Sequence, residues 1–191
     1  MITVFFVLVF VSAKANDVEQ AESFVQKLSN QIILIVENDL TINKKQQKLL
    51  SIFKRNASMT TISRAALGTK WRTLNDNTRE KFTDVFTQYL VRKYSKQFEE
   101  FSGAKLIVER SIDAGKKGVL VYTRLIMPAT SPISVKWQVW RKTGSLKLID
   151  IIIEDISMLT MEREEVKNRL TSNNNNIRSL IKDLRQNYNN D

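Results

Sequence analysis

The spacing of apolar residues along this chain changes near Ser102 and Gly103. Before that point apolar residues recur every three or four positions, which is typical of one face of a helix. After it they alternate with polar residues, as in half-buried strands, and helical spacing returns after Ser157. Helices, then strands, then helices predict an α+β fold with helices packed on one face of a curved sheet. A chain of 191 residues with 42% hydrophobic content predicts one domain.

About six helices are expected. Gly68 ends the third because glycine adopts the left-handed cap conformation without steric cost, and Asn75 or Asp76 can cap the fourth. In the helix after Ser157, Met158, Met161, Val166 and Leu170 are expected to point inward. The expected helical ranges are 17–39, 44–54, 58–67, 75–101, 157–170 and 177–184.

Four strands joined by short turns predict an antiparallel meander. The third strand alternates apolar and polar residues, which indicates one buried and one wet face. The last is apolar on nearly both sides, so we expect it to lie centrally or to be covered on its second face. The expected ranges are 104–110, 118–126, 133–141 and 146–154.

The first fifteen residues have the pattern of a secretory signal peptide. An apolar run is followed by Ala13-Lys14-Ala15, the small-x-small pattern before a cleavage site, although no Lys or Arg precedes the run. The run is about half the length that spans a bilayer. We therefore expect residues 1–15 to be removed and 16–191 to form the exported domain.

The chain contains no Cys and no His. Catalysis by Ser-His-Asp or Cys-His groups is excluded, and so are nearly all zinc sites, because their side chains are absent. Asp150 and Glu154 lie four apart on one strand, but nothing around them suggests acid-base chemistry. We expect Asp150 to bind an Arg or backbone amides, and Asp155 or Ser157 to cap the following helix. No catalytic and no metal-binding residues are predicted.

The formal net charge is +10, and residues 40–75 contain eight basic residues and no acidic ones. Such a block indicates an anionic partner. For an exported protein we expect a membrane surface rather than nucleic acid, while a plain solvated face remains the alternative. Trp71-Arg72 would lie at a cavity mouth or membrane interface, or would hold two helices together. The residues predicted to face a membrane or partner are Lys44, Lys45, Lys48, Trp71 and Arg72.

Two long segments resemble the MlaC family, also called the toluene-tolerance auxiliary component of an ABC transport system. They are "LGTKWRTLNDNTREKFTDVFTQYLVRKYSKQFEEFSG" and "LKLIDIIIEDISMLTMEREEV". Asp155 stands where that family usually has Gly, and Asn stands for Gly before the last helix; both tolerate left-handed backbone. Leu146 replaces a frequent Trp. The matching residues are Leu67, Gly68, Trp71, Arg72, Phe82, Phe86, Tyr94, Gly103, Asp150, Glu154, Ile156 and Ser157.

The resemblance implies a periplasmic phospholipid carrier that maintains lipid asymmetry. It would exchange lipid between an outer-membrane lipoprotein complex and an inner-membrane MCE-domain ABC transporter, as a monomer without cofactor other than its bound phospholipid. Such a carrier needs an apolar cavity between sheet and helices. Our candidates for its wall are Phe82, Phe86, Tyr89, Leu106, Val108, Val121, Leu125, Val135, Trp137, Val139, Ile151 and Ile153.

An alternative assigns every one of these apolar residues to ordinary core. The chain would then be an exported, non-enzymatic interaction or adaptor domain with a filled core. The sequence does not distinguish the two, because periodicity shows which way a side chain points but not whether the facing surfaces touch.

Overall fold

The computed structural model describes residues 12–128, 130–142 and 144–186. It contains six α-helices, as predicted, and two short 3₁₀ turns, Gly68–Thr73 and Gly115–Lys117. None of the described helices is long and apolar enough to cross a membrane. The helices are α1 (Ser12–Glu37), α2 (Ile42–Asn56), α3 (Met59–Leu67), α4 (Asp76–Glu99), α5 (Met158–Ser172) and α6 (Ile177–Gln186).

The strands form one antiparallel sheet in which sequence neighbours are spatial neighbours, in the order β1-β2-β3-β4-β5. The predicted meander is therefore confirmed. A fifth strand was missed, because its two residues are too few to show a period. The strands are β1 (Lys105–Asp113), β2 (Val119–Ile126), β3 (Ile133–Lys142), β4 (Ser145–Ile153) and β5 (Ile156–Ser157).

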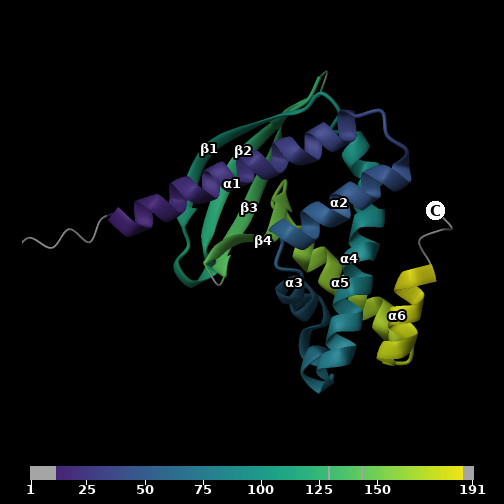
Figure 1. Ribbon diagram of the computed structural model, residues 1–191. Helices are drawn as coiled ribbons and strands as arrows, with labels where there is room; N and C mark the ends of the chain where they lie inside the picture. Colours follow the sequence, from purple (N-terminus) through teal and green to yellow (C-terminus); the bar gives the residue numbers. More distant parts are fainter. Residues whose placement is uncertain (1–11, 129, 143, 187–191) are drawn as a thin grey trace, which may run out of the picture.

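Helices pack against one side of the sheet (Figure 1). The long helix α1 crosses the strands, and α2, α4 and α5 lie beside one another past the β4 side, with α6 outermost. Apolar side chains from α1, α2, α4 and the inner sheet face form one continuous core. This arrangement leaves the space between sheet and helices as the place where a cavity can form.

The strand β4 is apolar on both sides because its alternation is interrupted. Val139 pairs with Leu148 and Trp137 pairs with Ile151, so Ile149 is an extra residue in a β-bulge. Leu148, Ile151 and Ile153 consequently all point toward the helices. We expected β4 to lie centrally or to be covered on both faces. It has strands on both sides only at its end, where β5 pairs with residues 152 and 153.

The chain leaves the sheet at a tight corner after Ile153. Glu154 and Asp155 both have positive φ, 46° and 66°, which confirms that Asp155 takes the left-handed conformation expected of a glycine position. The Ser157 hydroxyl accepts a hydrogen bond from the Thr160 amide, 3.0 Å, and donates one to Asp150, 2.6 Å. Asp150 also accepts the Leu159 amide at 2.9 Å. Ser157, not Asp155, is the helix cap, and Asp150 binds a backbone amide as predicted.

Replacing Ser157 by Ala is expected to lower the free energy of unfolding by about 1 kcal/mol, because the Thr160 amide loses its cap. Thermal melts of Ser157→Ala and of Ser51→Ala, a control at an exposed position of α2, measure this. Equal melting temperatures for the two variants and the parent would contradict the capping role.

The loop before α6 and the inward face of α5 were both predicted from the sequence. Asn174 and Asn175 have φ of 54° and 56°, so asparagine does occupy left-handed positions in the loop before α6. The prediction that Met161 points inward was wrong: 47% of it is exposed. Inward residues of α5 recur every four positions, so the buried position next to Val166 belongs to Glu162.

The predicted signal peptide lies largely outside the described residues. Of residues 1–15 only Ser12 to Ala15 are described, as the first residues of α1. The cleavage site between Ala15 and Asn16 remains a prediction.

Candidate functional site

Three apolar hollows lie between the sheet and the helices. Their volumes are about 110, 80 and 10 Å³. The largest is lined from α2, α3, α4, β4 and α5, and the second from α1, the end of α4 and strands β1 to β4. All three are bounded almost entirely by hydrocarbon, so their common chemistry fits acyl chains.

These hollows are compartments of one space, which we call the apolar chamber. Phe98, Phe101, Ile151 and Ile153 line both larger hollows, and Ile151 lines all three. The partitions between compartments are therefore side chains rather than backbone.

Half of the predicted wall residues border the chamber. They are all on the sheet: Leu106, Leu125, Val135, Trp137, Ile151 and Ile153. The Trp137 ring nitrogen donates to the Thr123 hydroxyl at 3.0 Å, which donates in turn to the Val135 carbonyl at 2.7 Å. The indole is thus held by a satisfied hydrogen bond and turns its hydrocarbon toward the chamber.

The other predicted wall residues lie elsewhere. Phe82, Phe86 and Tyr89 stack on one another along α4, with ring centroids 5.3 and 6.1 Å apart, inside the packed helical half. Val121 and Val139 are completely buried in the core, and Val108 packs against its edge. None of the six borders a hollow, so their placement gives no support to lipid contact.

Sequence reasoning missed the helical wall of the chamber. It used the first half of the apolar stripe of α4, whereas the chamber is lined by the second half, where Tyr94 and Phe98 lie, and by Phe101 just beyond the end of the helix. Those positions were visible as the continuation of the same stripe. The other missed side chains are Leu28, Ser29, Ile32, Ile33, Ile52, Phe53, Asn56, Ala57, Ile62, Leu90, Gln97, Ile133, Leu148, Ile149, Asp150, Met158, Leu159 and Glu162.

One ionic cluster borders the chamber. Glu162, 3% exposed, accepts hydrogen bonds from the Lys93 ammonium, 2.7 Å, and from the Tyr94 hydroxyl. Burial and the Glu162 charge raise the pKa of Tyr94. Burial opposes the charge of Lys93, but its hydrogen bond to Glu162 and the electrostatic attraction of Glu162 and nearby groups together outweigh this and raise the pKa of Lys93. The three side chains bind one another inside the protein, which suits a structural role.

The chamber is small for a two-chain lipid. Its compartments even together fall below the roughly 300 Å³ at which ligand pockets begin. Accepting two acyl chains therefore requires the partition side chains, and the helices that carry them, to move apart.

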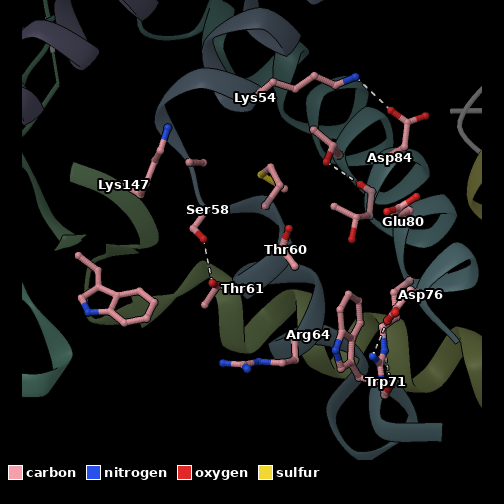
Figure 2. Close-up of a pocket in the computed structure, with 16 residues that line it drawn as sticks. Lys54, Ser58, Thr60, Thr61, Arg64, Trp71, Asp76, Glu80, Asp84 and Lys147 are labelled. Atoms are coloured by element: carbon pink, nitrogen blue, oxygen red, sulfur yellow. Dashed lines mark hydrogen bonds and ion pairs between the residues drawn. The ribbon is translucent and has the colours of Figure 1, made fainter. Parts of the chain in front are cut away.

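A larger hollow of about 830 Å³ lies at the surface, between α3, the first half of α4 and the β3-β4 hairpin. We call it the polar groove (Figure 2). One wall carries Arg64 and Lys147, and the α4 wall carries Asp76, Glu80 and Asp84. Lys54 reaches Asp84 across one end, with 3.0 Å between nitrogen and oxygen. Ser58 and Thr61 add hydroxyl groups, which share a hydrogen bond of 2.8 Å.

Two of the residues predicted to face a membrane or partner are instead engaged within the protein. Lys44, Lys48 and Arg72 are exposed. The Lys45 ammonium instead donates to the Val36 carbonyl at 2.9 Å and pairs with Glu99 at 3.5 Å. Trp71 is buried under the Arg79 guanidinium, which lies 5.7 Å from its ring centroid, so it holds the 3₁₀ turn Gly68–Thr73 against α4 as the alternative interpretation had it.

Comparison with known proteins gives matches along nearly the whole chain. The intermembrane phospholipid transport system binding protein MlaC of Haemophilus influenzae is 23% identical over 176 residues, which cover 90% of this chain and 75% of that protein. A phospholipid-binding protein from Ralstonia solanacearum, solved in complex with a phospholipid, superimposes with a TM-score of 0.74 at 15% identity. That match covers 88% of this chain and 97% of the other, so the two share a fold.

The family model described as MlaC protein matches residues 26–186, which include every described strand and every described helix except residues 12–25 of α1. The resemblance noted in the two sequence motifs is thereby extended to residues 26–186. This chain belongs to the MlaC protein family.

Proposed function

We propose that this protein carries phospholipid between membranes, with the acyl chains in the apolar chamber. The observation that carries the proposal is the chamber itself: compartments bounded by hydrocarbon lie where the sheet faces the helices, and Ile151 borders all of them. The membership in the MlaC family and the phospholipid held by the Ralstonia solanacearum protein of the same fold support it.

The physical need for a carrier follows from the hydrophobic effect. A phospholipid has about 30 methylenes to bury, and at roughly 0.8 kcal/mol each its bare transfer through water costs on the order of 20 kcal/mol. A chamber that replaces the membrane interior removes most of this cost. The partitions made by Phe98 and Phe101 let the compartments stay closed before lipid enters and join when it does.

The route we propose runs through the periplasm, between an outer-membrane lipoprotein complex and an inner-membrane MCE-domain ABC transporter. The name of the Haemophilus influenzae relative, a binding protein of an intermembrane phospholipid transport system, supports this route. Residues 1–15 would direct export. Maintenance of lipid asymmetry, action as a monomer and toluene tolerance belong to the same proposal.

Contact with membranes or partners would use the exposed side of α2. Lys44 and Lys48 lie there one turn apart, and both are exposed. Lys45 and Trp71 are excluded from this surface because both are engaged within the protein. Long-range attraction by such a face weakens with salt, so vesicle binding is expected to fall as ionic strength rises.

Native mass spectrometry of the exported chain, purified without detergent, tests the proposal. We expect a stoichiometric adduct with the mass of a phospholipid, identified in an organic extract of the same sample. A bare polypeptide mass that persists after incubation with vesicles would favour the alternative, an adaptor domain whose chamber stays closed.

A further inference from the structure

The polar groove contains two charged side chains of opposite sign that the fold does not use. Among the described residues, neither Arg64 nor Glu80 has a hydrogen bond or ion pair from its side chain. They come from opposite walls of the groove, Arg64 from α3 and Glu80 from α4 (Figure 2). The other charges nearby are engaged: Asp76 binds Arg79 at 2.9 Å, and Asp84 binds Lys54 at 3.0 Å.

The wall around Arg64 suits an anion. Lys147, whose ammonium donates to the Arg55 carbonyl, lies on the same side of the groove as a second cation, and Ser58 and Thr61 supply hydroxyl groups between them (Figure 2). The helix α3 begins there at Met59, so its positive end faces the same region. A guanidinium beside hydroxyls is well suited to the oxygens of a phosphodiester.

The wall around Glu80 suits a cation. Asp76, Glu80 and Asp84 follow one another at intervals of four along α4, and all three line the groove. Two of them are already neutralised within the protein, which leaves the Glu80 carboxylate as the acceptor for a positively charged ligand group. The groove thus separates a site for negative charge from a site for positive charge.

The groove adjoins the apolar chamber. Ala57 lines the groove and also two compartments of the chamber, and its side chain is a single methyl group. At this point the wall between them consists of the junction of α2 and α3 resting on β4, where the Ser58 amide donates to the Leu148 carbonyl at 2.9 Å. Groove and chamber therefore come closest at Ala57, and a ligand with apolar chains in the chamber and its polar end in the groove would pass this junction by parting the Ser58–Leu148 contact.

We propose that the polar groove binds the headgroup of the phospholipid, with the phosphate on the Arg64 wall and a cationic amine on the Glu80 wall. The groove would then select aminophospholipids without net charge over anionic phospholipids. This inference rests on the proposed carrier function and adds the headgroup class to it. The groove volume of about 830 Å³ lies within the range of small-molecule sites.

The test compares Arg64→Gln and Glu80→Gln with the parent protein. Each is incubated with vesicles of phosphatidylethanolamine or of phosphatidylglycerol with identical chains, and the loaded fraction is read by native mass spectrometry. Arg64→Gln is expected to weaken loading of both lipids about tenfold, because both have a phosphate. Glu80→Gln is expected to weaken only phosphatidylethanolamine, to a similar degree. Both residues are exposed, so both variants should fold.

Matched controls are Arg178→Gln and Glu19→Gln, exposed charges on α6 and α1 outside the groove. They should load both lipids like the parent. Competition with soluble glycerophosphoethanolamine and with inorganic phosphate separates a headgroup site from a free phosphate site. Only the former should compete; equal competition by inorganic phosphate would overturn the headgroup assignment.

Two failures can be told apart. If the parent loads lipid but Arg64→Gln and Glu80→Gln load both lipids as the parent does, the groove does not bind the headgroup, and the carrier proposal stands. If the parent loads neither lipid, the carrier proposal itself fails and the headgroup site with it.

Discussion

Phospholipid loading is expected to fall at least a hundredfold when Ile151 is replaced by Asp. Ile151 is the side chain common to all three compartments of the chamber, and it faces Trp137 across the β3-β4 ladder. A carboxylate there is either desolvated by the acyl chains, at a cost of several kcal/mol, or keeps water in the chamber. A loss of roughly 3 kcal/mol corresponds to a hundredfold weaker affinity.

The neighbouring residue provides the control. Ile152 pairs with Lys136 on the opposite face of the same strand, and Lys136 forms an ion pair with Asp155 there. Ile152→Asp makes the same chemical change outside the chamber and should load lipid normally. A second variant, Ile151→Trp, fills the space without adding charge and should also lose loading. Normal loading by both Ile151 variants would place the lipid somewhere other than this chamber.

Thermal stability is expected to fall most when Glu162 is replaced by Ala. The substitution leaves the half-buried Lys93 ammonium and the Tyr94 hydroxyl without their shared acceptor. Removing one partner of a buried ion pair costs about 3–5 kcal/mol. We expect the lower end of this range because 26% of the Lys93 side chain is exposed. For a domain of this size, 3 kcal/mol lowers the melting temperature by about 6–12 °C.

The control for Glu162 is Glu164→Ala. Glu164 lies two residues after Glu162 on the same helix and pairs with Lys167. Both of these side chains are more than half exposed, so the effect should stay below about 0.5 kcal/mol.

The ionic cluster of Glu162, Lys93 and Tyr94 also makes the stability depend on pH. Because the pKa of Lys93 is raised in the folded protein, its contribution is present below the pKa of the unfolded chain, near 10.4, and is lost at higher pH. Equal melting temperatures of Glu162→Ala and Glu164→Ala at pH 7 would contradict this assignment.

The sequence predicted most of the fold. The stripe on α4, the cap at Asn75, the stop at Gly68 and the alternation in β3 all depend on local rules, and each was found in place. Prediction from the sequence failed where an element was too short to show a period, or where the alternation of a strand was interrupted. The strand β5 has two residues, and the bulge at Ile149 turns apolar neighbours to the same side, which no strict alternation predicts.

The sequence predicted the sheet side of the chamber but not its helical side. Inward positions on the sheet were correctly assigned a direction, and six of them border the hollows. On α4, however, Phe82 and Phe98 have the same inward orientation in the sequence pattern, yet one lies in solid core and the other at the chamber. The difference is what faces each residue: Phe82 is completely buried in the core, whereas Phe98 borders a hollow whose opposite side is lined by strands β1 to β4.

The sequence by itself determined the order and type of the elements, the absence of His and Cys chemistry, and the family motifs, because these depend on residue identity and spacing. Only the tertiary structure decided which apolar surfaces close on each other, that Glu162 rather than Met161 is buried, and that Arg64 and Glu80 share one groove. The physical reason is that packing and charge pairing depend on distances between segments far apart in the chain, which periodicity along one segment does not contain.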